Sequence, residues 1–191
     1  MSILSNKQRE DFFIRLYFNT SKGYHHAGIF RAYLDFSRTL KIKNKEQHPK
    51  RKEDAFSWFN DNIQSLTNPN FSSQKEFDNK HEELCKNLVK YWSTLTIGQA
   101  QKWINMTLKY WLLLGKERIT NIEQNAKYFH IPIDGYVQRG MFKKEFPKPK
   151  PWSKISDYNE YFKYQSTHRE KSPDTKPIID EFEFFNDSII Q

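Results

Sequence analysis

Residues 95–114 read LTIGQAQKWINMTLKYWLLL, the most apolar stretch of the chain. Its large side chains fall on two stripes at helical spacing, the first with Ile97, Ala100, Ile104, Leu108 and Trp111 and the second with Trp103, Met106, Tyr110 and Leu114. Apolar coverage this wide is typical of a helix that is buried on most sides. The segment therefore predicts a central helix around which the rest of the chain packs.

Helical spacing of apolar side chains recurs on both sides of this segment. It predicts further helices over residues 7–19, 26–40, 56–66, 74–94 and 155–166. Polar composition predicts exposed connections over residues 41–54 and 116–130. Prolines at alternate positions predict an extended linker over residues 143–152. Together these patterns favour an all-α fold with two helical lobes around a cleft.

The order of these elements divides the chain into three parts. Residues 1–94 are predicted to form an N-terminal helical lobe, and residues 95–146 a second lobe. Residues 147–191 hold the Pro-rich linker, the late helix and an acidic tail with an apolar end, Phe182 to Ile190. We expect this tail to pack back on the body, and it is also a candidate docking segment for a protein partner.

The chain is basic and rich in aromatic residues. Its 31 Lys and Arg against 23 Asp and Glu give a net charge of +8, and aromatic residues make up 16% of the chain. A positive excess attracts polyanions, and aromatic faces can stack on bases. We therefore expect a nucleic acid as the partner, duplex DNA in the first place, with basic clusters at 41–52 and 143–150 near its phosphates.

Several classes of protein are disfavoured by what the sequence lacks. Cys85 is the only cysteine, so an internal disulfide is excluded and a reducing cytoplasm is expected. No apolar run approaches 18 residues and the first residues lack a hydrophobic signal core, so we expect no membrane span. No phosphate-binding loop or Cys/His zinc spacing is present, and we therefore expect no cofactor and no metal.

Two segments stand out as a pair that could carry chemistry. In the first, Gly98 stands at the start of the central helix and Lys102 follows one turn later. In the second, Asp134 comes just after Pro132, where a helix N-cap is expected, and Arg139 lies about one turn inside the next helix. Taken singly, each residue also has an ordinary structural explanation: a turn glycine, a solvated lysine and a capping aspartate.

The joint spacing resembles the helix-hairpin-helix DNA glycosylases of the endonuclease III and 8-oxoguanine glycosylase type. That family has a hairpin glycine, a lysine four residues later and often an asparagine after three more, which Gly98, Lys102 and Asn105 match. It then has an apolar residue, a catalytic aspartate and a basic residue five positions on. Ile133, Asp134 and Arg139 match that second motif. The resemblance covers about 40 residues.

The chain also departs from this family at four points. The turn Leu95 to Gly98 has one glycine where the family has two, and 32 residues separate Lys102 from Asp134, more than is usual. The cysteines that hold the iron–sulfur cluster in endonuclease III are absent, and Tyr136 stands where a histidine is common.

The resemblance implies a base-excision glycosylase in repair or phage defence. Asp134 would stabilise the cationic sugar, and the Lys102 amine could attack the sugar carbon to form a Schiff base. We expect the nucleic acid to contact Gly98, Gln99, Gln101, Asn105, Tyr136, Arg139, Lys143 and Lys144. The alternative is a non-catalytic protein on the same helical scaffold, which holds a nucleic acid or acts in host–phage conflict by binding a protein or a nucleotide.

Overall fold

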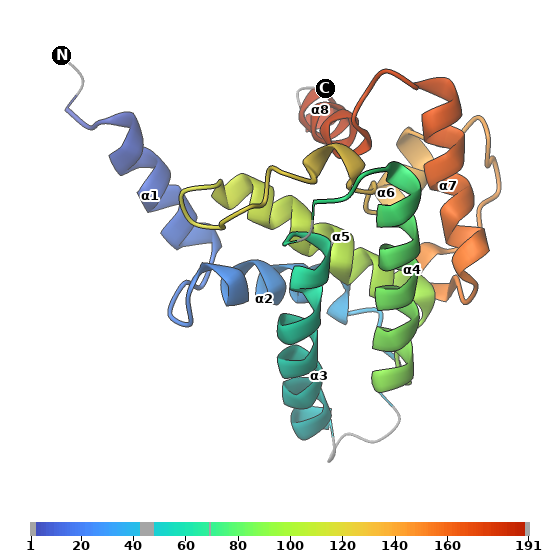
Figure 1. The fold of residues 1–191 in the computed structure, drawn as a ribbon, viewed down its shortest axis with the longest axis horizontal. Coiled ribbons are helices and arrows are strands. Elements are labelled where there is room, and N and C mark those ends of the chain that lie inside the picture. Colours follow the sequence, from blue (N-terminus) through green and yellow to red (C-terminus); the bar gives the residue numbers. More distant parts are fainter. Residues whose placement is uncertain (1–2, 43–47, 69, 190–191) are drawn as a thin grey trace.

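The computed structural model describes residues 3–42, 48–68 and 70–189, and in these ranges the chain is all-helical, without a strand. Eight α-helices and three short 3-10 helices follow one another along the described chain (Figure 1): α1 (Asn6–Tyr17), α2 (Tyr24–Ser37), α3 (His48–Ile63), η1 (Gln64–Leu66), α4 (Gln74–Tyr91), α5 (Ile97–Leu114), η2 (Ala126–Tyr128), α6 (Gly135–Gly140), η3 (Trp152–Lys154), α7 (Tyr158–Lys171) and α8 (Pro177–Ile189). The predicted all-α class is confirmed, whereas the division into two lobes around a cleft stays a prediction.

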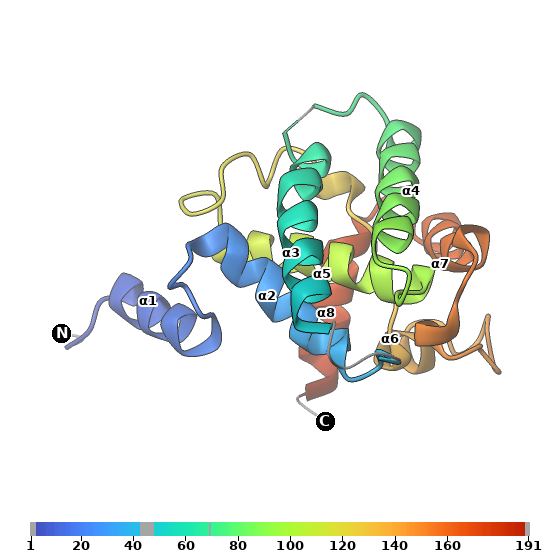
Figure 2. The ribbon, with the colours of Figure 1, turned by 90° about the horizontal axis from the view of Figure 1, so that it is seen from below.

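Helix α5 is the predicted central helix and lies in the middle of the molecule. Figure 2 shows α3 and α4 on one side of it and α8 on the other. All its residues from Ile97 to Trp111 are buried, polar ones included. The other helices therefore surround α5, and the buried core continues through all three predicted parts of the chain.

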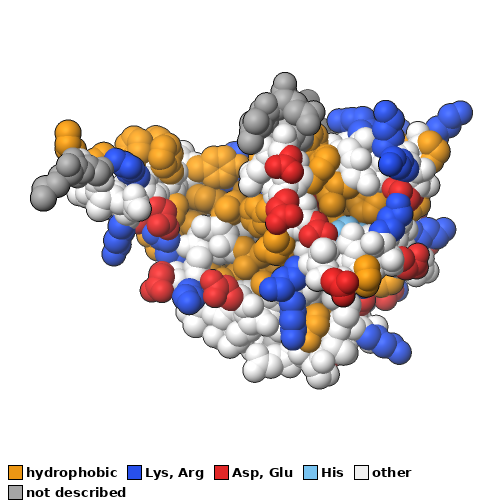
Figure 3. Space-filling model, turned by 90° about the horizontal axis from the view of Figure 1, so that it is seen from above, with side chains coloured by type: hydrophobic (Ala, Val, Ile, Leu, Met, Phe, Trp, Pro, Cys, Tyr) orange, Lys and Arg blue, Asp and Glu red, His pale blue; other side chains and the backbone are white. Residues whose placement is uncertain are grey.

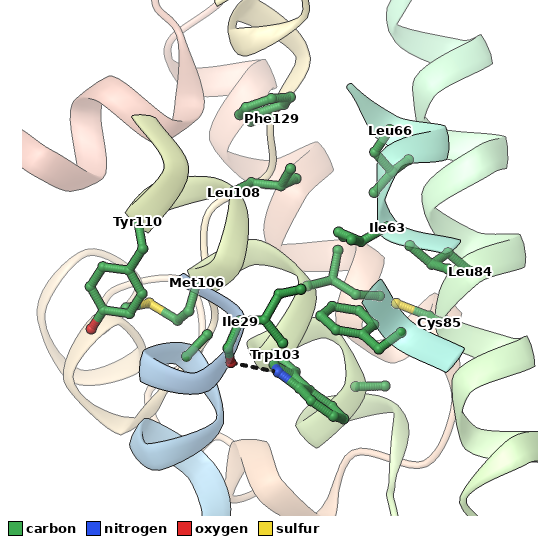
Figure 4. Close-up of a cluster of buried hydrophobic side chains, with 14 of the residues drawn as sticks. Ile29, Ile63, Leu66, Leu84, Cys85, Trp103, Met106, Leu108, Tyr110 and Phe129 are labelled. Carbon is green, nitrogen blue, oxygen red and sulfur yellow. Dashed lines mark hydrogen bonds between the residues drawn. The ribbon is translucent and has the colours of Figure 1, made fainter. Parts of the chain in front are cut away.

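The indole of Trp103 organises the core on the side of α2 and α3 (Figure 4). It stacks on Phe59 with the ring centroids 4.5 Å apart, and its Nε1 donates a 3.0 Å hydrogen bond to the Ile29 carbonyl. On the same side, Gly28 lets α2 approach α5, because a Cβ there would lie 2.5 Å from the Trp111 ring. Aromatic rings and one glycine thus set the close packing of α2 on α5.

The start of α5 is fixed by Thr96 and not by Gly98. The Thr96 hydroxyl accepts the Gln99 amide at 3.2 Å, while the Gln99 side chain accepts the Thr96 amide at 3.0 Å. This reciprocal capping box satisfies two amide donors that the helix itself leaves unpaired. Gly98 lies inside the first turn, where a Cβ would come within 1.8 Å of the Trp152 carbonyl oxygen. Its role is therefore close packing against η3, and our expectation of a turn glycine is wrong.

Helix α1 extends away from the other helices in Figures 1 and 2. Ile14 and, just beyond its end, Phe18 are its buried anchors. Phe12, Phe13 and Leu16, which define its predicted apolar spacing, are instead 59 to 67% exposed. Hydrophobic side chains accordingly gather at the left of Figure 3, over α1.

Two predicted connections differ from the structure. Helix α3 begins at His48, so Lys50 and Lys52 are helical and not part of an exposed loop; the stretch 43–47 lies outside the described residues. The connection after α5 is not exposed throughout, because Ile119, Ile122 and Phe129 are buried in the core. Polar composition does not decide either feature. Charged residues can lie on the outer face of a helix, and an irregular segment can bury isolated apolar side chains.

The C-terminal region largely follows its prediction. The chain turns through residues 141–145, bends at 147–148 and has no regular structure over 149–151, so the extended linker predicted over 143–152 is not formed as such. Helix α8 packs back on the body with Ile178 and Glu181 buried. None of the helices in the described ranges is both long and apolar enough to cross a membrane.

Candidate functional site

Asp134 is the N-cap of α6, as its place after Pro132 predicts. Its backbone is extended, and its carboxylate Oδ1 accepts hydrogen bonds of 2.8 Å from the amides of Tyr136 and Val137. An acidic side chain at this position satisfies free amide donors and lies at the positive end of the helix dipole. One carboxylate oxygen is thus committed to the helix, and the other is left for a second partner.

That second partner is Lys102, from the middle of α5. Its Nζ lies 2.7 Å from Asp134 Oδ2, and the two side chains are 6% and 26% exposed. The pair joins two helices across 32 residues of sequence. The two residues that the motif match singled out therefore form one contact, with the lysine buried and the carboxylate partly open to solvent.

Neighbouring groups hold Asp134 in its ionised form. Burial by itself raises its pKa, but the charge and hydrogen bond of Lys102 and the amides of Val137 and Tyr136 outweigh burial and lower the pKa below the usual value. The ammonium of Lys102 and the start of α6 thus both stabilise the carboxylate. A carboxylate that stays charged can stabilise positive charge developing nearby.

A second buried ion pair lies two turns further along the same face of α5. Lys109 pairs there with Glu181 of α8, and both side chains are buried. The Lys109 ammonium also lies 4.6 Å from the centre of the Phe182 ring and 5.0 Å from that of Phe185. Tyr136 of α6 in turn contacts Phe184, with the ring centroids 5.1 Å apart. Helix α8 therefore contacts α5 at Lys109 and α6 at Tyr136.

Four of the residues expected to contact nucleic acid lie in the interior. The Gly98 amide donates to the Ile155 carbonyl at 2.9 Å, and the Gln99 side-chain amide donates to Thr39. Gln101 bonds the backbone at Gly98 and Ile133, and Asn105 belongs to a buried polar network, described below. In this conformation none of the four offers its polar groups at the surface, which does not fit the expected phosphate contact of Gly98.

The other four expected contact residues are exposed: Tyr136, Arg139, Lys143 and Lys144. The last three belong to what we call the basic segment, residues 139–154. It carries six exposed Lys and Arg and one acid, Glu145, and so contributes +5 to the net charge of +8. Lys and Arg side chains gather at the right of Figure 3, the side on which α7 lies in Figure 1.

A polar network that was not predicted from the sequence lies in the core between α4, α5 and α7. Asp78 accepts a hydrogen bond of 2.7 Å from His130 and two, of 2.7 and 2.9 Å, from Arg169. The Tyr161 hydroxyl links His130 to Asn105, with bonds of 2.8 and 2.9 Å. His130, at the end of the connection over 116–130 that was predicted to be exposed, is completely buried. The signal for it was spacing: Asp78 precedes His81 by one turn of a strongly amphipathic helix.

His81 extends this network toward Cys85. The two nitrogens of its ring bond Tyr158 at 2.8 Å and Asn105 at 2.9 Å, and Cys85 Sγ lies 3.7 Å from Nδ1. Cys, His and Asn in this order form a nucleophilic site only where solvent and substrate reach the sulfur. Here all three are buried, and burial raises the pKa of the Cys85 thiol well above its usual value. The cluster is therefore structural.

Within the described ranges, no three His, Cys, Asp or Glu side chains lie close enough together to hold a metal ion. Comparison of the chain with family models, with curated proteins and with solved structures found no match. The site must therefore be interpreted from its own geometry.

Proposed function

We propose that this chain binds nucleic acid, duplex DNA in the first place, through the basic segment. The observation that carries the proposal is the concentration of six exposed cations within residues 139–154. Phosphate contacts by Lys and Arg supply most of the affinity of sequence-independent DNA binding. Exposed side chains on one short helix and the loop after it can follow a phosphate backbone without any change in the core.

A charge-reversal experiment tests this proposal. Lys143→Glu/Lys144→Glu changes two exposed side chains in a turn, and Lys75→Glu/Lys90→Glu makes the same change in net charge on α4. In fluorescence anisotropy with a labelled duplex, we expect the first variant to lose about tenfold or more in affinity and the second to lose much less. Equal losses would mean that net charge alone attracts DNA, and the basic segment would then not be the binding surface.

We propose base excision as a second candidate function, because Lys102 and Asp134 lie in direct contact next to the start of α6 and the basic segment. In this mechanism the Lys102 ammonium gives up a proton to water, and the charged carboxylate of Asp134 stabilises the positive charge that develops on the sugar. The neutral amine then attacks the sugar carbon of an extruded nucleotide, and the base leaves with the bonding electrons and takes up a proton. The nitrogen then loses a proton and the bond between the sugar carbon and the ring oxygen breaks, which opens the sugar and leaves a Schiff base that water later hydrolyses.

Lys102 is buried, so this second function also requires a movement of the chain that exposes its amine. An assay for abasic sites on duplexes with uracil, 8-oxoguanine, alkylated or hypermodified bases tests it directly. Binding without any base release would support the non-catalytic alternative, in which Lys102 and Asp134 tie α5 to α6.

A further inference from the structure

A groove of about 520 Å³ lies between α2 and α3, away from the basic segment in sequence and on other helices. Its lining combines lysines, aromatic rings and short polar side chains: Lys22, His26, Phe30, Lys52, Glu53, Phe56, Ser57 and Asn60. Its volume lies within the range of about 300–1,000 Å³ that is usual for small-molecule sites.

The wall of the groove is an aromatic surface that the protein leaves partly uncovered. His26 and Phe30 stack in parallel, with ring centroids 6.1 Å apart and an interplanar angle of 11°, and Phe56 lies 6.0 Å from His26. All three side chains are only partly buried. Partly open aromatic faces at the edge of a groove can stack a planar ring, and each base stacked in this way contributes about 1–3 kcal/mol.

Positive charge lies directly beside this surface. The Lys52 ammonium is 4.7 Å from the centre of the Tyr33 ring and 5.8 Å from those of Phe30 and Phe56. Burial lowers the pKa of His26, and the nearby charge of Lys22 lowers it further. Within the described ranges, neither lysine has a carboxylate at ion-pair distance. Two cations are therefore available to an anion at the rim.

We propose that the groove between α2 and α3 binds a single nucleotide unit. The base stacks on His26 and Phe30, and the phosphate lies between Lys22 and Lys52. Glu53, Ser57 and Asn60 supply acceptors and donors for the edge of the base. A planar ring joined to an anion matches this lining, whereas a fully apolar ligand would leave the lysines unused and an inorganic anion would leave the rings unused.

The nucleotide unit has two possible sources, a free mononucleotide and an unpaired stretch of nucleic acid. Isothermal titration with AMP, with adenosine, with inorganic phosphate and with an eight-residue oligodeoxyadenylate separates them. We expect AMP to bind more tightly than adenosine or phosphate, because only AMP uses the rings and the lysines together. Competition by the oligonucleotide against AMP indicates a single-stranded source, and AMP binding without competition indicates a free nucleotide.

Variants assign the binding to the groove. Phe30→Leu keeps an apolar side chain but removes the stacking face, and we expect AMP affinity to fall about tenfold. Lys52→Gln removes the phosphate partner, a half-buried lysine of α3, and is expected to weaken AMP binding with little effect on adenosine. Lys50→Gln, two residues away on the same helix and outside the lining, is the matched control and is expected to bind AMP like the wild type.

A histidine titration provides a readout beyond affinity. A bound phosphate beside Lys22 offsets the positive charge near His26, so AMP is expected to raise the pKa of His26 in an NMR titration of its ring protons. Two outcomes would overturn the proposal. In the first, inorganic phosphate binds as tightly as AMP. In the second, Phe30→Leu and Lys52→Gln both leave the affinities for AMP and for the oligonucleotide unchanged. Because Lys143→Glu/Lys144→Glu is expected to retain AMP binding, a failure here is distinguishable from a failure of the basic segment to bind DNA.

Discussion

The ammonium of Lys102 and the carboxylate of Asp134 lie 2.7 Å apart, although 32 residues separate them in the sequence. The lysine is buried and the aspartate also caps α6, so each residue has a structural task besides any chemical one. Substitutions that keep one task and remove the other can tell the two apart.

Asp134→Asn keeps the cap and removes the charge. Asn is as good an N-cap as Asp, so we expect the variant to fold, with some loss of stability because the buried Lys102 ammonium loses its countercharge. Asp134→Ala loses about a further 1 kcal/mol because it also removes the cap. If the chain excises bases, Asp134→Asn is expected to abolish base release and to leave DNA affinity unchanged or higher, since a negative charge near the phosphates is gone. The measurement combines thermal unfolding with an abasic-site assay, and full activity of Asp134→Asn would eliminate Asp134 as the catalytic group.

Borohydride trapping examines Lys102 separately. If Lys102 forms a Schiff base, borohydride is expected to link the protein covalently to a duplex with the damaged base, and Lys102→Gln to stop this. On a duplex with a preformed abasic site, where no base has to leave, Asp134→Asn is expected only to slow it. Ile104→Ala, in the same helix, is the control for destabilisation and is expected to cost about 2–5 kcal/mol without a specific effect on trapping. Peptide mapping that finds the link at another lysine would exclude Lys102 as the nucleophile.

DNA binding is expected to depend strongly on salt. Each phosphate that the protein neutralises contributes about 0.9 to the slope of log affinity against log salt, so contacts from all six cations of the basic segment predict a slope of about −5. Lys143→Glu/Lys144→Glu is expected to reduce the slope by about 2. Anisotropy titrations between about 50 and 200 mM salt measure it. A flat dependence would contradict phosphate binding altogether.

Acid is expected to destabilise the fold through its buried histidines. Burial lowers the pKa of His81 and of His130 in the folded state, although Asp78 opposes the shift. The unfolded chain therefore takes up these protons first. The stabilisation is fully present above pH ~6.5, and each histidine loses up to about 1.4 kcal/mol per pH unit below it.

Urea unfolding at a series of pH values between 7.5 and 5 measures this loss. His130→Gln is expected to reduce the slope of the unfolding free energy against pH by the contribution of one histidine, whatever its effect on stability at neutral pH. Unfolding free energies that stay constant or rise toward pH 5 would show that the two histidines are not buried neutral.

The ion pair of Lys109 with Glu181 is expected to couple α8 to the body. Glu181→Gln leaves a buried ammonium without its countercharge and is expected to cost about 3–5 kcal/mol. Glu183→Gln, on the same helix but exposed, is expected to change stability by less than about 0.5 kcal/mol. Chemical denaturation compares the two, and similar effects would mean that α8 is not held by this pair.

The architecture could be predicted from the sequence to the extent that apolar side chains repeat along a helix. Helix α5 is unambiguous because two stripes cover it, and the Asp134 cap follows from Pro132 and the start of α6. The start of α3 was missed because Lys50 and Lys52 are compatible with a helix as well as with a loop. The exposed ring faces of Phe12 and Phe13 could not be foreseen, since spacing predicts a helix but not which of its faces finds a partner.

The candidate site was predictable in one part only. The spacing of Gly98, Lys102 and Asp134 singled out the last two as candidate site residues without predicting a contact, and the structure brings them together. Gly98 was expected at a phosphate, but its amide is used by Ile155, which is 57 residues away in the chain and has no sequence signal for this contact. The network around Asp78 was also missed, because only Asp78 and His81 share a local spacing, while its other members come from α5, α7 and the connection before α6.

The buried position of Cys85 has a practical consequence. Its thiol is inaccessible and, with its raised pKa, almost entirely protonated at neutral pH, so a disulfide reagent reacts with the folded chain only when α4 separates from α5 and α7. Since no other residue of the chain carries a thiol, every labelled molecule reports one such opening. The labelling rate under native conditions then gives the free energy of that opening without an added probe, and its change on ligand binding shows whether the ligand holds these helices together.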